Sequence, residues 1–217
     1  MSPKRTSDSR SRYDPETTRQ VLLDAAFDEI YLNGFRAAGL DAILSKTGVT
    51  KGALYHHFGN KQGLGYAVVE ERVDALVHDR YIDPFKATED PIQGMQQMGL
   101  RMESELLKVG ILKKGCPVNN LVQEMSGVDE GFRLRLAKIL DKWSETIADG
   151  LRRGQAEGTV RSDIDALEVA TFFVASYQGA CGYCKNSQDI KQFTDARKHL
   201  DKYVETLRAV PQKQTAA

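Results

Sequence analysis

Residues 50–61 read TKGALYHHFGNK, and this stretch decides more about the fold than any other part of the chain. Within about three helical turns it combines apolar anchors with a phenol, two imidazoles and two ammonium groups. Apolar side chains can hold a helix against its own domain, whereas imidazole and ammonium groups suit contact with a polyanion. The stretch therefore predicts a short helix that turns one face toward a negatively charged partner.

A second helix and a tight turn precede this stretch. Residues 40–46 have the apolar spacing of one helical face, and residues 47–49 supply the turn. Gly48 can adopt the positive φ that such a corner requires. The hydroxyl of Thr50 is expected to cap the next helix. Together these features predict a helix-turn-helix in which residues 51–57 form the recognition helix.

The same part of the chain resembles the DNA-binding domain of tetracycline-repressor (TetR) family regulators. The resemblance covers about residues 15–75 and is specific because glycines, aromatic residues and lysines match together. Its residues are Asn33-Gly34-Phe35, Ile43, Gly48-Val49-Thr50-Lys51-Gly52, Leu54-Tyr55-His56-His57-Phe58 and Lys61. It implies a homodimeric transcriptional repressor, not an enzyme, that an effector releases from a palindromic DNA operator. Beyond residue 75 the resemblance is one of length and helical layout.

The resemblance also implies how single residues meet DNA. Residues that approach base edges are Lys51, Gly52 and His56, and residues that hold the DNA backbone are Thr50, Tyr55, His57 and Lys61. Without a Cβ at Gly52, the helix can lie close to the groove floor. This helix contains no Arg, Asn or Gln, so specificity is expected to rest on few contacts and on DNA shape. Ala38-Gly39 departs from the family, which often carries two phosphate-binding hydroxyl residues there.

Composition limits where a nucleic-acid surface can lie. The chain has 217 residues, of which 41% are hydrophobic and 28% charged, enough for a small and a larger helical domain. The 30 Lys and Arg residues balance the 30 Asp and Glu residues, so a basic footprint must be local. Residues 40–61 carry Lys46, Lys51, Lys61 and two histidines against Asp41 alone, which makes them that footprint.

The chain ends and the absence of long apolar runs suggest further properties. Residues 1–14 are basic, and we expect them to be disordered until they meet DNA; residues 210–217 are expected to be a disordered tail. No apolar run approaches a transmembrane span, and the N-terminus has no apolar signal segment. We therefore expect a cytoplasmic protein that does not bind membranes.

Proline, glycine and helical periodicity predict an all-α fold of about nine helices. The DNA-binding domain is expected over residues 15–62, and an effector-binding and dimerisation domain over residues 63–209. The expected helices are 15–33, 40–46, 51–57, one long helix from 60 to about 81, 91–109, 118–125, 132–151, 166–186 and 190–207, with a loop at 110–117. The long fourth helix joins the two domains.

The last two expected helices carry the predicted dimer interface. Small residues in the first of them, Gly179, Ala180 and Gly182, allow another helix to approach closely, and the family builds its dimer from these two helices. In the last helix an apolar stripe includes Phe193, Leu200 and Val204, which we expect a partner subunit to cover.

The three cysteines allow two interpretations. Cys181 and Cys184 fit an apolar helical stripe and are expected to be small buried hydrophobes, because no second cysteine pair or βαβ pattern supports a redox motif. Cys116 follows Lys113 and Lys114 and precedes a helix, which could favour a reactive thiolate; the alternative is a small loop residue. The competing function from another class is a thiol redox or metal-binding protein that uses all three.

Few residues suggest other chemistry. Adjacent side chains on a helix point about 100° apart, so His56 and His57 cannot share one metal ion well. We expect no catalytic residue, cofactor or metal. An effector, either a small molecule or an electrophile, is expected among the fifth to eighth helices. The candidate lining residues are Met98, Met102, Cys116, Leu121, Met125, Trp143, Phe172 and Tyr177.

Overall fold

The computed structural model describes residues 14–108 and 110–210 and confirms the all-α class. Within these ranges no strand is present, and the one β-type feature is an isolated bridge between Val160 and Arg208. Nine of the helices in the described ranges have eight residues or more, as expected. The predicted tails, residues 1–14 and 210–217, lie outside the described residues except at their inner ends.

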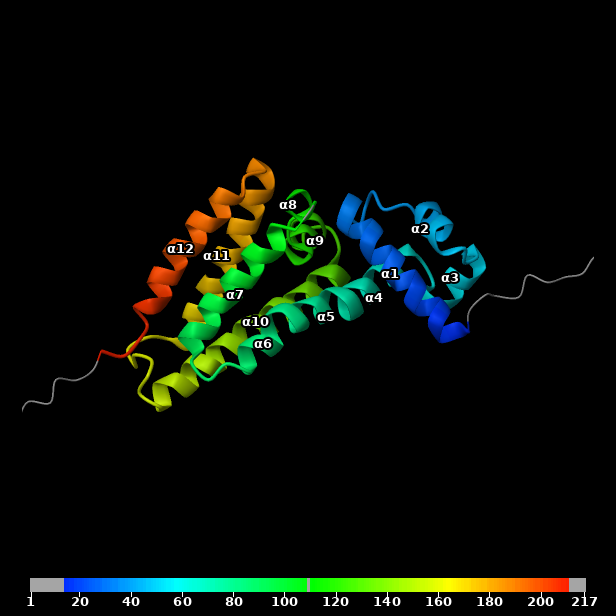
Figure 1. Cartoon of the computed structure of the whole chain (residues 1–217). Coiled ribbons are helices and arrows are strands. Elements are labelled where there is room, and N and C mark those ends of the chain that lie inside the picture. Colours follow the sequence, from blue (N-terminus) through cyan, green and yellow to red (C-terminus); the bar gives the residue numbers. More distant parts are fainter. Residues whose placement is uncertain (1–13, 109, 211–217) are drawn as a thin grey trace, which may run out of the picture. The chain divides into compact units, whose positions relative to one another are not determined.

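Contacts divide the chain into two compact units, the first ending at Val68 and the second beginning at Val69. The helices of the first unit are α1 (Pro15–Asn33), α2 (Leu40–Thr47), α3 (Lys51–Phe58) and α4 (Lys61–Val68) (Figure 1). Those of the second unit are α5 (Asp74–Val77), α6 (Asp83–Lys86), α7 (Pro91–Leu106), α8 (Ile111–Lys114), α9 (Pro117–Met125), α10 (Glu130–Ala156), α11 (Ala166–Ser187) and α12 (Ile190–Glu205). This division falls a few residues after the domain boundary expected at residue 62.

Helix α1 forms the centre of the first unit because its ends and its buried face are clearly specified. The carboxylate of Asp14 accepts hydrogen bonds from the backbone N–H groups of Glu16 and Thr17, at 3.0 and 3.1 Å. Pro15 occupies the first turn, where a missing N–H costs nothing. At the other end Gly34 takes a φ of 81° and stops the helix. The buried face includes Leu22, Leu23, Ala26 and Ile30.

The helix-turn-helix predicted from the sequence is confirmed. Gly48 ends α2 in the left-handed conformation with φ 67°. Thr50 then caps α3, since its hydroxyl oxygen accepts a hydrogen bond from the Ala53 backbone N–H at 3.2 Å. Leu54 is fully buried and anchors α3 to the rest of the unit. Burying one leucine contributes about 1.5–3 kcal/mol, which matters for a helix of only eight residues.

The long fourth helix predicted from residue 60 is not a regular α-helix. After α4 the chain passes through two π-helical segments, Val69–Val73 and His78–Ile82, with α5 between them and α6 after them. Val69, Val73, Val77 and Tyr81 are all buried at every fourth position. That spacing drifts around an α-helix of 3.6 residues per turn, and the wider π turns reduce the drift.

The second unit is built around four long helices. Helix α11 packs against α10 and α12, and α7 packs against α10 and α12, as Figure 1 shows for the green, yellow and orange ribbons. Trp143 of α10 is fully buried, and its ring stacks on that of Tyr81 with 4.7 Å between centroids. Other large side chains of this core are Phe132, Phe173, Tyr177 and Phe193.

Several boundaries differ from the expectation. Helix α10 runs from Glu130 to Ala156 and is longer at both ends than the expected 132–151. Helix α7 ends at Leu106, earlier than the predicted residue 109, which itself lies outside the described residues. The predicted loop at 110–117 contains the single-turn helix α8. Gly110 and Gly115 flank this turn with φ of 77° and 73°, so one helical turn can form between two sharp corners.

The apolar stripe of α12 does not await a partner subunit, and this expectation was wrong. Phe193 and Val204 are fully buried and Leu200 is 8% exposed within the single chain. The reason is that α12 packs on both α7 and α11 of its own unit and has only one apolar stripe with which to do so. A dimer surface must therefore use other residues.

Candidate functional site

One face of α3 is open to solvent. Lys51, Gly52 and His56 are exposed, and Tyr55 is 40% exposed. His57 is half-buried, and its ring lies edge-on to that of His56 with 5.3 Å between centroids. The ammonium of Lys51 lies 6.0 Å from the Tyr55 ring centroid. The open face thus gathers a cation, a phenol and an imidazole around a position with no side chain.

Gly52 is not required by the fold of this chain. A Cβ added there would meet only the hydroxyl oxygen of Thr50, at 4.0 Å, which is an ordinary contact. Its backbone is helical, so alanine would favour the helix by about 1 kcal/mol. The glycine therefore leaves a gap on the outer surface of α3, where a partner could approach the backbone.

Lys61 begins α4 and folds back over the loop between α1 and α2. Its Nζ donates a hydrogen bond to the backbone carbonyl of Arg36 at 3.0 Å and lies 5.1 Å from the Phe35 ring centroid. Asn60 accepts a hydrogen bond from the Gly63 N–H at 2.8 Å and so caps this helix start. The Lys61 side chain is half-buried.

Lys46 does not belong to the free basic footprint expected over residues 40–61. Its Nζ donates to the carboxylate of Glu29 at 2.8 Å, and the Glu29 side chain is only 8% exposed. The hydrogen bond from Lys46 holds the pKa of this carboxyl below its usual range despite burial. The footprint left on the surface consists of Lys51, Lys61 and the two histidines.

Most of the predicted effector residues lie in the interior of the second unit. Seven are buried: Met98, Met102, Cys116, Leu121, Met125, Trp143 and Tyr177. The Trp143 indole N–H donates to the sulfur of Met98 at 3.2 Å, so the two side chains are packed directly together. Phe172 is 52% exposed and was wrongly placed inside. Its neighbour Phe173 is the buried one, because only one of two adjacent helical residues can face the core.

Cys116 is buried, which contradicts the low-pKa thiolate and favours the other interpretation, a small packed residue. Burial raises the pKa of its thiol, and this outweighs the backbone N–H groups of Asn119 and Val118 and the Gln178 amide, which act in the opposite direction. Lys113 is exposed, whereas Cys116 is buried. The amine of Lys185 donates a hydrogen bond to the Asn120 side-chain oxygen at 2.9 Å.

The other two cysteines are buried, as the apolar stripe of α11 indicates. Cys181 is 1% exposed and its thiol contacts the sulfur of Met102 at 3.2 Å. Cys184 is fully buried, and burial raises the pKa of both thiols. All three cysteines are free. Over the described ranges, no group of three or more His, Cys, Asp and Glu side chains converges where a metal could bind.

Comparison with known proteins identifies the family. The model of bacterial regulatory proteins of the tetR family matches residues 22–68, and that of the tetracyclin repressor-like C-terminal domain matches residues 103–200. The chain belongs to the TetR family. It is a DNA-binding transcriptional regulator and not an enzyme, which removes the thiol redox enzyme considered from the sequence.

Individual relatives cover most of the regulator's length. The transcriptional regulator AcuR of Cereibacter sphaeroides is 29% identical over 183 residues, which are 82% of each chain. The HTH-type transcriptional repressor DhaR of Mycobacterium sp. is 25% identical over 178 residues, 81% of this chain and 87% of that one. A TetR regulator structure from Chloroflexus aurantiacus superimposes with a TM-score of 0.81 at 24% identity, covering 90% and 98% of the chains. This last likeness concerns the fold.

TetR-family regulators bind DNA as dimers, and the second unit of this regulator has an outward face on α11. Phe172 and Tyr183 are 52% and 60% exposed, with the exposed small residues Ala175 and Gly179 between them. The Phe172 ring packs edge-on against Tyr203 of α12, with 5.1 Å between centroids. Nothing lies within 4 Å of a Cβ added at Gly179. Aromatic side chains therefore frame a shallow, small-residue surface.

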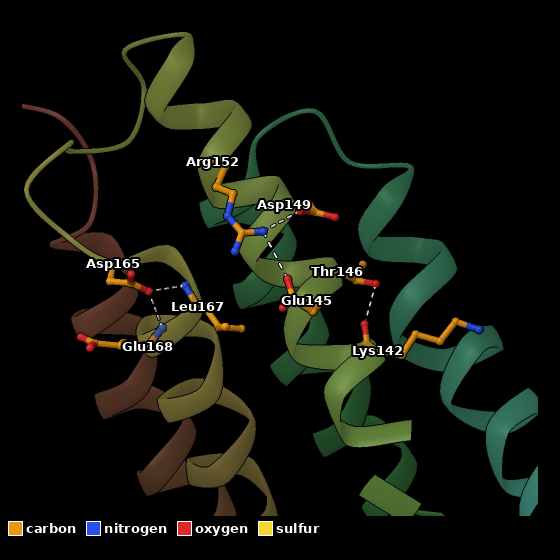
Figure 2. Close-up of polar contacts among 8 residues, drawn as sticks. All are labelled: Lys142, Glu145, Thr146, Asp149, Arg152, Asp165, Leu167 and Glu168. Carbon is orange, nitrogen blue, oxygen red and sulfur yellow. Dashed lines mark hydrogen bonds and ion pairs between the residues drawn. The ribbon is translucent and has the colours of Figure 1, made fainter. Parts of the chain in front are cut away.

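An open groove of about 1070 Å³ includes part of this face, since Ala175, Gly179 and Tyr183 belong to its lining. It lies between α9, α10 and α11, and its lining includes Leu140, Val174 and Gln178 but none of the predicted effector residues. At one end Glu145 and Leu167 line it; the Glu145 carboxylate accepts from Arg152 at 3.2 Å, and Arg152 also binds Asp149 (Figure 2). The charge of Glu145 at this end of the groove is thus partly neutralised by Arg152 of the same helix.

Among the described residues, no helix is both long and apolar enough to span a membrane.

Proposed function

We propose that this regulator is a homodimeric repressor that places α3 of each protomer in successive major grooves of a palindromic operator. The observation that carries the proposal is the division of α3 between Leu54, which is fully buried, and the exposed Lys51, Gly52 and His56. A helix fixed on one side and cationic on the other can enter a groove without unfolding its own domain. The relative DhaR, named a repressor, supports repression as the outcome.

The exposed groups suggest distinct roles on DNA. Lys51 and His56 are proposed to approach base edges on either side of Gly52, whose missing side chain permits the approach. Thr50, Tyr55, His57 and Lys61 are proposed to hold phosphates. Because the Lys61 amine already binds the Arg36 carbonyl, it would reach a phosphate while remaining anchored, which costs less side-chain entropy.

Dimerisation is proposed to use the outward face of α11 and α12. An isologous contact through Phe172, Gly179 and Tyr203 would bring two copies of one face together. Small residues between aromatic ones let the backbones of facing helices approach closely. The two recognition helices of such a dimer would read half-sites about 34–36 Å apart or wider.

Release from DNA is proposed to follow the binding of a reversible small molecule. Such an effector shifts the population only if it binds the DNA-incompetent state more tightly. The buried thiol of Cys116, whose pKa is raised, favours a reversible ligand over a thiol-reactive one. The predicted interior residues other than Phe172 remain the candidate lining, with Met98 and Met102 as the adaptable side chains. Because DNA is its partner, we propose that the regulator acts in the cytoplasm.

Replacing Gly52 with leucine tests the docking of α3. The added side chain has open space in the protein, so the variant should fold, but it should lose binding to a duplex that the wild type enriches from a random-sequence pool. We expect at least a hundred-fold loss, or about 2.8 kcal/mol, because the helix can no longer approach the base edges. Fluorescence anisotropy with the enriched duplex measures the change.

Gly127 provides a matched control for this substitution. Among the described residues it also has nothing within 4 Å of an added Cβ, and it belongs to the second unit, whereas the helix-turn-helix belongs to the first. Gly127→Leu adds the same apolar surface and should bind the duplex like wild type. Wild-type affinity in Gly52→Leu would reject the docking of α3, whereas the family assignment would stand.

A further inference from the structure

Glu29 is a buried carboxylate in the DNA-binding unit that the proposed contacts do not use. It lies on α1, is 6% exposed, and is the one charged residue among the buried polar residues in the described part of the chain. Charged groups are rarely buried unless paired, because removing them from water costs several kcal/mol. Its partners therefore indicate why the unit keeps a charge at this place.

Three groups bind the Glu29 carboxylate, and they come from different parts of the unit. Lys46 of α2 donates to Oε2 at 2.8 Å, and the Asn33 side chain at the end of α1 donates to Oε1 at 2.8 Å. The backbone N–H of Gly39 is a further hydrogen-bond donor to this carboxylate. The charge is thus satisfied on several sides, which is the condition under which a buried carboxylate is stable.

These partners hold both ends of α2. Gly39 is the N-cap of α2 and has no side chain with which to cap it. Lys46 lies in the last turn of the same helix. Since side chains on a helix point back toward its N-terminus, the long Lys46 stem can reach the carboxylate that also binds Gly39. One residue of α1 therefore fixes the start of α2 and a side chain from its end.

The position of α2 in turn sets the position of the recognition helix. Only Gly48, Val49 and Thr50 separate α2 from α3. Gly48 ends α2 and Thr50 caps α3, so little slack remains between the two helices. We propose that Glu29 is a positioning residue for operator recognition: by holding α2 through Lys46 and Gly39, it orients α3 for base contact without touching DNA itself.

Glu29→Gln and Lys46→Met test this proposal. Each variant should lose affinity for the wild-type-enriched duplex by roughly ten-fold, the size expected when one base contact is lost. Affinity for a shuffled duplex of the same composition should not fall, because phosphate contacts do not depend on base register. The double variant should lose no more than the worse single variant, since both remove one interaction.

Asp28→Asn is the matched control. Asp28 is the exposed neighbour of Glu29 on α1, so the variant removes the same charge without touching α2. The ratio of its affinity for the enriched duplex to its affinity for the shuffled duplex should equal that of the wild type. Circular dichroism melts establish whether each variant is folded at the assay temperature. If Glu29→Gln is unfolded, the test rests on Lys46→Met, because this variant keeps the hydrogen bonds of Asn33 and Gly39 to the carboxylate.

Two results would overturn the proposal. An unchanged ratio of enriched to shuffled affinity in folded Glu29→Gln or Lys46→Met would reduce the pair to a stabilising contact. A Lys46→Met variant that weakens both duplexes equally and lowers the salt slope by about one would make Lys46 a phosphate contact. Neither result would affect the outcome at Gly52, so failure here is distinguishable from failure of DNA docking.

Discussion

At the scale of single residues, Cys116 shows how burial and a helix terminus compete. The positive end of a helix and nearby N–H groups favour a thiolate, and α9 supplies both through Val118 and Asn119. Full burial can raise the pKa of an acid by several units, which is more than one helix end offsets. The net direction is a raised pKa, so the thiol is protonated at neutral pH.

We predict that Cys116 reacts slowly in the native protein. Iodoacetamide attacks the thiolate, so at neutral pH the native chain should be labelled at Cys116 at least ten-fold more slowly than the urea-unfolded chain. Peptide mass spectrometry separates Cys116 from Cys181 and Cys184. If Cys116 is labelled as fast in the native protein as in the unfolded protein, the hypothesis of a reactive Cys116 thiolate would be supported instead.

The same pKa shift makes a prediction for stability, with its sign fixed by linkage. The thiol of the unfolded chain has a pKa of about 8.5, and burial raises the pKa of the folded thiol. Between those two values the folded state holds the proton that the unfolded state has lost, so the thiol's contribution to stability is complete below about pH 8.5 and declines above it. Cys116→Ala should show a smaller loss of stability between neutral and alkaline pH in urea titrations.

At the scale of helices, the contact between α7 and α11 depends on one missing side chain. A Cβ at Gly99 would lie 1.7 Å from the hydroxyl oxygen of Tyr177 and 2.9 Å from its ring carbon Cζ. The Tyr177 hydroxyl is buried and has no hydrogen-bond partner among the residues that the structure describes. The Tyr177 side chain of α11 can therefore reach the backbone of α7 only because residue 99 is glycine, and its hydroxyl is left unsatisfied there.

We predict that Gly99→Ala lowers the free energy of unfolding by about 2–3 kcal/mol, because an overpacked core must shift. Tyr177→Phe should be neutral or stabilising, since it removes a buried hydroxyl without a partner. In the double variant the loss of unfolding free energy caused by Gly99→Ala should be roughly half as large, because the ring carbon Cζ of residue 177 still lies close to position 99. Urea unfolding of the four proteins measures the coupling; additive effects would contradict the assigned contact.

Local signals account for what the sequence predicted about the elements. Gly48 and Thr50 specify a turn and a cap within a few residues, so the helix-turn-helix was predictable. The pair of Lys46 with Glu29 spans 17 positions and was not, because Glu29 on its own resembles a solvent-exposed acid. Likewise, α11 offers Phe172 and Phe173 in succession, and only packing decides which of them faces the core.

At the scale of the whole molecule, apolar periodicity identifies a buried face but not what buries it. The stripe of α12 with Phe193 and Leu200 was assigned to a partner subunit, yet α7 and α11 of the same chain cover it. Periodicity is the same in both cases. The effector region shows the same limit, because Met and Trp residues that pack a core have the spacing of residues that line a cavity.

The outward aromatic residues of α11 give the last prediction. Phe172→Glu should convert the dimer to a monomer in sedimentation velocity runs at micromolar concentration, because a charge on a self-complementary face is repeated in the facing copy. Operator affinity should fall with it, since each monomer makes half the contacts. Leu100→Glu is the control: Leu100 is 51% exposed, almost the same as Phe172, but lies on α7 outside the proposed interface. Leu200→Glu would instead unfold the second unit, because Leu200 is internal. A dimeric Phe172→Glu protein, or monomeric Leu100→Glu, would move the interface away from α11 and α12.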